Sequence, residues 1–463
     1  MKNMKKIIQP VFYISALLLV VSCNKQLDLK PTDSIDVSKA FTSVSDLEKG
    51  LLGVYSANDN NNRIYIGSLL ADEVKLSNEN RGQGQFEYKW QYSASLNNTN
   101  AAYPQYYTMI DRLHRVLEAM DAVPAANATE EATKKRVAAE LIALRGIAHF
   151  ELLIRFMPPG YDAGALGVPI MLKSDLGAAP ARNTVGEVIS QIEQDLSAGR
   201  AEAAIPSAPT DPLRLSQAAI AAYQARVALL KRDWASAIVF ANDAITLSGK
   251  SLAGGATFTD FWKDANQSET IFNFRNRATP QLFWRDTNGD VFFEPSDEVK
   301  SLFDKVNDIR FSTYFTSDGA DTSLVNKYPG STTGPQINDL KLVRLAEMYL
   351  IRAEAQAENN QLGAAANDIN ALRATRITGY SDVTFSSKDQ AISEIMNERF
   401  KELCYEGFRF FDLKRRGLDV SRLSSDVQSS TWQNLPANDF HFALPIPQEE
   451  IFANPQMTQN TGY

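Results

Sequence analysis

Hydrophobic and small residues recur at helical spacing over much of the chain. This periodicity predicts helices over residues 42–55, 103–121, 130–156 and 185–200. Thr184 stands directly before the last of them and is suited to cap its first turn. Residues 58–100 are instead rich in Asn, Gly and Tyr, so we expect an irregular, exposed loop there.

Two later segments have the pattern of helical hairpins. Residues 216–247 place alanines at helical spacing on both sides of Arg232-Asp233, and small residues at Ala225 and Ala237 would let two antiparallel helices approach closely. Residues 342–373 repeat this spacing with Ala353 and Ala365. Such pairs are typical of tetratricopeptide repeats. We therefore predict a mainly α fold, a tetratricopeptide-like scaffold of helical pairs with long irregular, loop-rich insertions and few short strands.

The N-terminus has the pattern of a lipoprotein signal. Lys2, Lys5 and Lys6 precede an apolar run over residues 11–21, which is too short to span a bilayer and suits a signal peptide. The run ends in Val-Val-Ser-Cys, the pattern of a bacterial lipobox, so we predict cleavage before Cys23 and its acylation. An ordinary secretory signal with an incidental cysteine is the alternative.

The predicted organisation follows from these patterns. A signal peptide (1–22) precedes the lipidated cysteine and a polar tether (23–40), an N-terminal helical region (41–248) and a C-terminal region (249–463). We divide the last into a loop-rich insert (249–338), helices (339–417) and an irregular tail (418–463).

Composition narrows the classes of function. Cys23 and Cys404 are the only cysteines, so acylation of Cys23 leaves no intrachain disulfide. The net charge is −8, and removal of three signal lysines leaves −11 for the mature chain. This acidity argues against nucleic-acid binding and against electrostatic docking on anionic lipid.

Motifs for catalysis and for metals or cofactors are scarce. The chain has three histidines and lacks HExxH, paired CxxC, Walker and GxSxG patterns, so we expect no cofactor, no metal and no catalytic residue. Residues 286–290 (DTNGD) resemble a calcium loop only faintly, and a plain turn is favoured. Glu398 and Glu402 lie four residues apart beside Arg399, which predicts ion pairs that lower carboxyl pKa values rather than a general acid.

Four C-terminal segments resemble the SusD/RagB family of Bacteroidetes outer-membrane nutrient-binding lipoproteins. NDLKLVRLAEMYLIRAEA and AANDINALRATR resemble two successive family helices, IMNERFKELCYEGFRFFDLKRRG resembles the ER-EL-EG-R-DL segment, and LPIPQEEIFANPQMTQNTGY resembles the closing signature. AAELIALRGIAHFELLIRF is similar to an N-terminal family helix, with Gly146 where alanine is usual. The matching positions are Arg344, Glu347, Glu354, Asn370, Arg373, Glu398, Arg399, Glu402, Glu406, Arg409, Asp412, Pro445, Pro447, Glu450, Asn454, Gln459, Asn460 and Tyr463.

The resemblance implies a role and its partners. It implies a lipid-anchored, surface-exposed outer-membrane protein that captures an oligosaccharide without altering it. It also implies a SusC-like TonB-dependent transporter as partner, over which the lipoprotein acts as a lid. Several of the motifs are expected to be packing devices.

Aromatic and polar residues outside the long helices predict where a sugar binds, because pyranose C–H groups stack on ring faces while hydroxyls seek polar side chains. The favoured ligand contacts are Trp90, Trp284, Tyr65, Arg81, Phe283 and Asn98. Aromatic residues alternate at strand spacing in FEYKWQY (86–92), so one face of that segment, Trp90 included, could instead be core. Trp234, Trp262 and His149 are expected to pack internally.

Three other functions remain open from the sequence. The same uptake role could serve peptides derived from protein. A lipid-anchored glycoside hydrolase would need two carboxylates facing each other across a cleft. A purely structural tetratricopeptide adaptor of envelope proteins would bind no small ligand.

Overall fold

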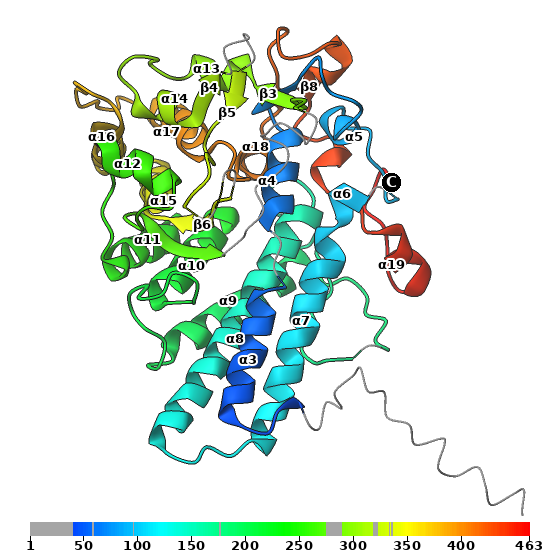
Figure 1. Ribbon diagram of the computed structural model, residues 1–463. Coiled ribbons are helices and arrows are strands. Elements are labelled where there is room, and N and C mark those ends of the chain that lie inside the picture. The colour runs from blue at the N-terminus through cyan, green and yellow to red at the C-terminus, as the bar shows by residue number, and fades with distance from the viewer. Residues whose placement is uncertain are drawn as a thin grey trace, which may run out of the picture.

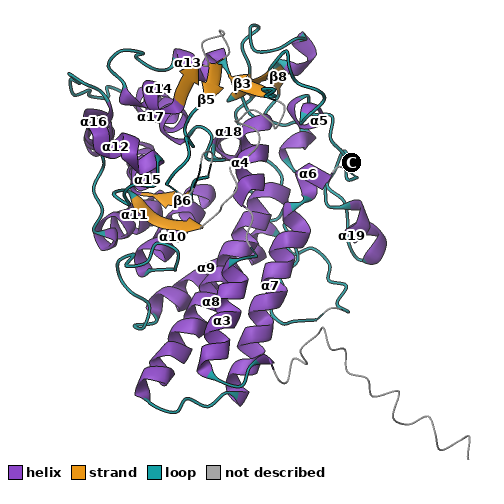
Figure 2. Cartoon of the chain, viewed as in Figure 1, coloured by secondary structure: helices purple, strands orange, loops and turns teal. Residues whose placement is uncertain are grey.

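The computed structural model describes residues 40–57, 60–95, 97–175, 177–274, 289–317, 323–332, 334 and 337–463. Helices dominate this part of the chain, and its short strands lie between them (Figure 2). The helices are α3 (Val44–Tyr55), α4 (Asn60–Leu69), α5 (Gln85–Tyr88), α6 (Asn97–Asn100), α7 (Ala102–Ala119), α8 (Ala128–Phe156), α9 (Val185–Ala201), α10 (Gln217–Lys231), α11 (Trp234–Ser248), α12 (Gly255–Trp262), α13 (Asp297–Ser301), α14 (Ile309–Tyr314), α15 (Leu345–Glu358), α16 (Leu362–Arg376), α17 (Lys388–Leu403), α18 (Arg409–Arg416) and α19 (Gln448–Ala453).

The strands form antiparallel pairs between distant parts of the chain. Among the described residues β1 pairs with β3, β2 with β6, β4 with β5 and β7 with β8. Their bounds are β1 (Val74–Leu76), β2 (Thr270–Phe274), β3 (Phe293–Pro295), β4 (Phe315–Ser317), β5 (Ser323–Val325), β6 (Leu340–Arg344), β7 (Val420–Ser421) and β8 (Asn434–Leu435). The mainly α fold with few short strands is confirmed.

The four long helices α3, α7, α8 and α9 begin and end within two residues of the predicted bounds. In Figure 1, α3, α7, α8 and α9 run alongside one another in the lower part of the view. Thr184 caps α9 as predicted, since its side chain accepts from the backbone N–H of Glu187, and the Glu187 carboxylate accepts from the Thr184 backbone in return. No helix in the described ranges is apolar and long enough to cross a bilayer.

Both predicted hairpins form, and they stack on each other. α10 packs on α11, α15 packs on α16, and α11 contacts α15 although about a hundred residues separate the two hairpins in the chain. Ala225, Ala237, Ala353 and Ala365 are all fully buried at the helix contacts. A small side chain at each of these positions permits the close approach.

The prediction of an irregular, exposed loop over residues 58–100 is wrong. Residues 58–100 contain α4, β1, α5 and α6, and Ile66 and Leu69 of α4 are fully buried. The insert 249–338 has irregular stretches between short elements, namely α12, α13, α14 and strands β2 to β5. Its Phe258, Phe261 and Trp262 lie in a second hydrophobic cluster together with Leu69 of α4. The polar residues that suggested loops lie beside buried aromatic and aliphatic side chains, and burial of the latter decides the structure.

Candidate functional site

The carboxylates that could suggest catalysis are locked in a buried ionic network. The Glu402 carboxylate accepts from Arg376 at 3.0 Å, from Arg344 at 3.0 Å and from Arg310 at 3.1 Å. The three guanidinium groups hold the pKa of Glu402 well below its usual range, although burial opposes them. The pKa of Glu398 is lowered in the same way by Arg310, Lys401 and Arg373. The prediction that ion pairs lower these carboxyl pKa values is confirmed, although the neighbouring Arg399 pairs with Asp412 instead. Both carboxyl groups stay ionised rather than acting as general acids.

Other family-like motif residues also pack against one another. Arg399 makes a two-point contact with Asp412 at 3.0 Å, and Arg415 grips Glu354 at 2.6 and 2.7 Å. In the closing segment, the Asn460 side chain donates to the backbone oxygens of Phe156 and Leu444. These motif residues connect the helices to one another and to the C-terminal tail, which agrees with the prediction that several of the motifs serve packing.

Cysteine and histidine show structural roles. Cys404 is a free, buried thiol whose pKa burial raises, so its reactive thiolate is disfavoured. His149 is fully buried; its Nδ1 lies 3.0 Å from the Arg145 oxygen and its Nε2 lies 3.2 Å from the Met171 nitrogen. Burial lowers the pKa of His149 to about 3, so the ring is neutral and Nδ1 carries the proton. Within the described residues no group of His, Cys, Asp and Glu is arranged to hold a metal.

The structure places Trp90 in the core, not on an exposed ligand face. Its exposed fraction is 6%, its Nε1 donates to the Leu70 oxygen at 3.0 Å, and the Arg422 guanidinium lies 4.2 Å from its ring centroid. The segment forms helix α5 and a turn instead of a strand, and Trp90 has φ +54° in that turn. The expectation of Trp90 as a stacking platform is therefore corrected to the core alternative.

The other predicted ligand contacts differ in how exposed they are, and some lie outside the described residues. Tyr65 is half-buried between two hydrophobic clusters, Arg81 is exposed and pairs with Asp290, and Asn98 is exposed on α6. Trp284, Phe283 and the predicted acylation site Cys23 lie outside the described residues, as do the first three residues of the DTNGD turn. Trp284, Phe283, Tyr65, Arg81 and Asn98 remain predicted contacts.

A large groove that the sequence did not predict is the main candidate site, and we call it the α7–α19 groove. It has a volume of about 810 Å³ and is lined by α7, by the loop between α8 and α9 (the post-α8 loop, residues 157–184) and by α19 with the residues just before it. Figure 1 shows where α7 and α19 lie in the fold. Its lining residues are Asn100, Ala101, Tyr103, Pro104, Tyr107, Thr108, Ile110, Asp111, Pro169, Met171, Lys173, Asp175, Ala178, Pro180, Pro447, Glu449, Glu450 and Ala453. A cavity of this size is in the range of small-molecule and oligosaccharide sites.

Two tyrosines form an aromatic floor in this groove. Tyr103 and Tyr107 lie one helical turn apart on α7, with ring centroids 4.8 Å apart and tilted planes. Tyr103 is buried against Phe156, whereas Tyr107 is only partly buried. The Tyr107 hydroxyl donates to the Pro169 oxygen at 2.8 Å, which fixes the orientation of its ring. A fixed, partly exposed ring is suited to stack on an apolar ligand face.

The opposite wall is held in place by buried polar groups. Arg182 donates to the Gly167 oxygen at 2.7 Å and to Asn460 Oδ1 at 2.8 Å, which joins the post-α8 loop to the C-terminal tail. His149 accepts from the Met171 nitrogen, and His114 Nε2 lies 3.1 Å from the Met171 oxygen. The groove is therefore largely preformed, which reduces the entropic cost of binding.

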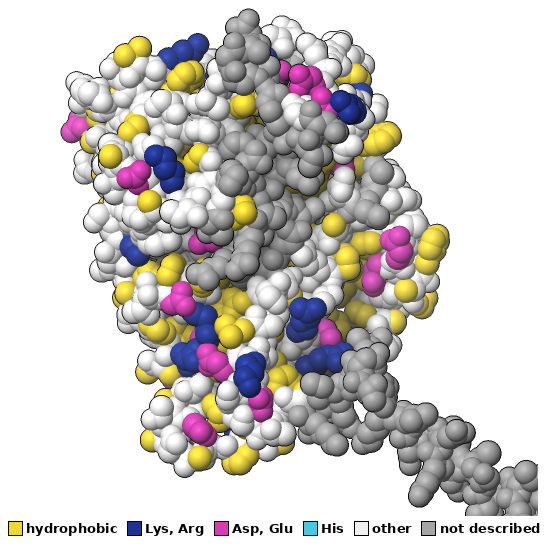
Figure 3. All heavy atoms as spheres, in the orientation of Figure 1, with side chains coloured by type: hydrophobic (Ala, Val, Ile, Leu, Met, Phe, Trp, Pro, Cys, Tyr) yellow, Lys and Arg dark blue, Asp and Glu magenta, His cyan; other side chains and the backbone are white. Residues whose placement is uncertain are grey.

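The rim is polar and mostly acidic. Asp111 is already engaged, since it accepts from Ser174 at 2.6 Å and from Arg115 at 2.8 Å, and Asp175 pairs with Lys173 at 2.9 Å. Glu449 is exposed on α19 and Glu450 is partly exposed beside it. Figure 3 shows acidic and hydrophobic side chains next to one another on the exposed surface of α19. These carboxylates can accept hydrogen bonds from hydroxyl or ammonium groups.

The groove could not be found by a local motif. Its residues come from 100–111, 169–180 and 447–453, and only the fold brings them together. The local signal at this site is the aromatic run over residues 103–107, which lies at the start of the helix that the sequence predicts over 103–121.

Comparisons with known proteins decide the family. The profile "Starch-binding associating with outer membrane" matches residues 25–229, and the profile "SusD family" matches residues 304–463. The chain belongs to the SusD/RagB family. The two matches together leave residues 1–24 and 230–303 unmatched, which include the signal region, α11 and part of the insert.

Individual relatives agree with this assignment. A SusD-like protein of Formosa agariphila is 21% identical over the whole of both chains. The starch-binding protein SusD of Bacteroides thetaiotaomicron is 30% identical over 36% of this chain and 28% of its own. The crystal structure of a SusD superfamily protein from the same species has a TM-score of 0.81 and 25% identity, covering 90% of this chain and 100% of that one. The SusD superfamily fold with its tetratricopeptide-like packing is thus shown.

Proposed function

We propose that this SusD/RagB protein captures a glycan segment in the α7–α19 groove and does not alter it. The observation that carries the proposal is the partly exposed Tyr107 ring, fixed at the floor of a large groove with polar groups on its rim. The C–H face of a pyranose stacks on such a ring while its hydroxyls donate to carboxylates. The profile named for starch binding covers α7 and the post-α8 loop, and with them two of the three groove walls.

The acidic residues of the groove do not suit glycoside hydrolysis. Hydrolysis requires two carboxyl groups on opposite sides of the scissile bond, about 5 to 9.5 Å apart. Glu449 and Glu450 are neighbours on one short helix, and the carboxylates of Asp111 and Asp175 are each held by a cation. This arrangement supports binding without catalysis.

Titration against a panel of neutral oligosaccharides tests the site. We expect saturable binding that Tyr107→Ala weakens about five- to thirtyfold, the equivalent of about 1–2 kcal/mol of lost ring contact. Tyr380→Ala is the matched control, because this tyrosine is bonded to Asn370 on α16 and does not line the groove. Unchanged affinity in Tyr107→Ala would refute the groove as the binding site.

The same titration distinguishes the groove from the contacts predicted by sequence. Trp284→Ala and Arg81→Ala leave every groove residue unchanged. If these variants lose binding while Tyr107→Ala retains it, the ligand binds at the predicted aromatic loop and not beside α7.

Delivery to a transporter extends this proposal. A lipid anchor at Cys23 would hold the protein at the outer membrane, where it would act as a lid on a SusC-like TonB-dependent transporter. The lipobox and the outer-membrane association named by the matching profile support this role. Cells fed labelled fatty acid should label the native chain and not Cys23→Ala, and the native chain should co-purify with a TonB-dependent barrel. Co-purification only with other envelope proteins would favour a structural adaptor.

One observation favours a peptide as the alternative ligand. The groove is lined by Asp111, Asp175, Glu449 and Glu450 against the single cation Lys173. An acidic rim attracts lysine- or arginine-containing peptides, and such binding would weaken steeply with salt. Binding of a neutral glycan would change little between 50 and 500 mM NaCl, so salt dependence separates the two ligand classes.

A further inference from the structure

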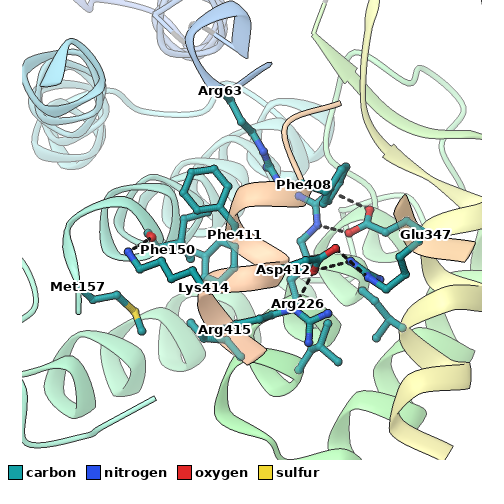
Figure 4. A pocket seen from close by; sticks show the side chains of 15 residues that line it. Arg63, Phe150, Met157, Arg226, Glu347, Phe408, Phe411, Asp412, Lys414 and Arg415 are labelled. Carbon is teal, nitrogen blue, oxygen red and sulfur yellow. Dashed lines mark hydrogen bonds and ion pairs between the residues drawn. The ribbon is translucent and has the colours of Figure 1, made fainter. Parts of the chain in front are cut away.

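A small pocket, separate from the α7–α19 groove, lies where α8, α10, α15, α17 and α18 meet. Its volume is about 60 Å³, enough for about four water molecules, and it shares no lining residue with the groove. Phe150, Ile154 and Ile351 supply apolar walls. Charged side chains converge on the same space, as Figure 4 shows for Arg226, Glu347 and Asp412.

Two buried arginines on this pocket each keep one unpartnered donor. Arg226 donates two hydrogen bonds to the Glu347 carboxylate, from Nε at 2.7 Å and from Nη2 at 2.8 Å. Arg399 donates to the Asp412 carboxylate from the same two nitrogens, both at 3.0 Å. The Nη1 of each has no hydrogen-bond partner among the described residues. Both side chains are more than nine-tenths buried and line the pocket. Unsatisfied buried N–H groups of this kind call for a water or an anion as acceptor.

A buried lysine beside the pocket has no acidic partner among the described residues. Lys414 is 3% exposed and donates to the backbone oxygens of Ile154 at 2.8 Å and Arg155 at 3.2 Å. It forms no ion pair with any residue that the structure describes. Burial and the neighbouring Arg155 lower the pKa of Lys414 well below its usual range. An anion nearby would favour its charged form.

The surrounding ion pairs do not supply that anion. Arg63 and Arg155 share the one carboxylate of Glu151, Arg415 pairs with both Glu354 and Asp412, and Arg416 pairs with Glu358 at 2.6 Å. Each acid beside the pocket is therefore already committed to at least one arginine. An acceptor for the two Nη1 groups must come from outside the chain, because a buried donor without a partner is costly.

We infer that this pocket is a binding site for a small monovalent inorganic anion such as chloride, held by Nη1 of Arg226 and Nη1 of Arg399. The apolar walls suit a weakly hydrated ion, and the volume excludes larger organic acids. The ion would sit where α10, α17 and α18 meet, and would join the hairpin scaffold to the C-terminal helices.

Ion-dependent stability of the purified full chain provides a first test. We expect the melting temperature to be about 2–4 °C higher in sodium chloride or bromide than in sodium gluconate at equal ionic strength, since gluconate is too large for the pocket. Lys414→Met keeps the apolar stem and should abolish most of this difference. Lys231→Met, which removes a lysine paired with Glu193 on the surface of α10, should retain it. Equal melting temperatures of the native chain in chloride and gluconate would overturn the proposal.

Crystals of the native chain grown in bromide provide a second test that does not depend on a variant. We expect an anomalous peak within hydrogen-bonding distance of both Nη1 atoms. A pocket that contains only water, or bromide bound elsewhere, would refute the site.

Discussion

Replacement of Glu73 by glutamine should remove a pH dependence of stability that this one carboxyl group creates. Glu73 follows α4 and is fully buried. Its Oε2 accepts from the Ser68 hydroxyl at 2.6 Å, whereas Oε1 has no hydrogen-bond partner within the described ranges. Burial is the main cause that raises the pKa of Glu73 from 4.5 to about 8, and Asp72 adds to it. The folded chain therefore holds this proton at neutral pH.

The sign and the size of the effect follow from proton linkage. Between pH 4.5 and 8 the folded state binds one proton more than the unfolded state, so the free energy of unfolding falls as pH rises. From pH 6 to pH 9 the free energy of unfolding of the native chain should fall by roughly 2.5 kcal/mol because of Glu73 alone. Glu73→Gln keeps the shape and a partner for Ser68 but does not titrate, so this loss should vanish.

Urea unfolding at pH 6 and pH 9 measures the difference. The native chain should lose more stability across this range than Glu73→Gln by roughly 2.5 kcal/mol, while other titrating groups cancel in the comparison. Glu131→Gln on α8 is the matched control, because its carboxylate is about half exposed. Equal pH dependence of the native chain and Glu73→Gln would show that Glu73 is ionised in the folded state and would refute the reasoning.

Three further predictions concern the ionic network, the groove wall and a close contact. Arg344→Met should lower the free energy of unfolding by about 3–5 kcal/mol in urea titrations, because Glu402 and Glu406 lose a shared buried partner; a loss below 1 kcal/mol would contradict this. The pKa of His149 is lowered to about 3 in the folded chain, so the unfolded state takes up a proton first as pH falls below 6.5. The free energy of unfolding of the native chain should therefore fall by about 2 kcal/mol between pH 7 and pH 5 because of His149, and His149→Gln should lack this loss. A Cβ at Gly67 would lie 2.7 Å from the Gly407 Cα, so Gly67→Ala should cost about 1–3 kcal/mol in thermal unfolding, whereas Gly53→Ala, with open space around it, should be neutral or stabilising.

Local sequence signals were sufficient for the long helices and the hairpins. The alanine spacing around Ala225 and Ala237, and the capping residue Thr184, act within a few residues of where they stand. The ion pairs of Glu398 and Glu402 are different, because their arginine partners Arg310, Arg344 and Arg376 belong to other segments that only the fold brings to α17. Helix periodicity and caps are short-range effects, so the sequence reveals them directly.

Contacts between segments that are distant in the sequence decide which aromatic residues are buried and where the groove forms. Trp90 is buried because Arg422, more than three hundred residues later, lies against its ring, and no local pattern contains that information. The groove likewise needs α7, the post-α8 loop and α19 to meet, and Arg182 joins two of these walls through Asn460. The sequence thus determined the family, the helical scaffold and its likeness to nutrient-binding lipoproteins. Which aromatic rings face solvent was decided only by tertiary packing, because burial depends on neighbours that the fold supplies.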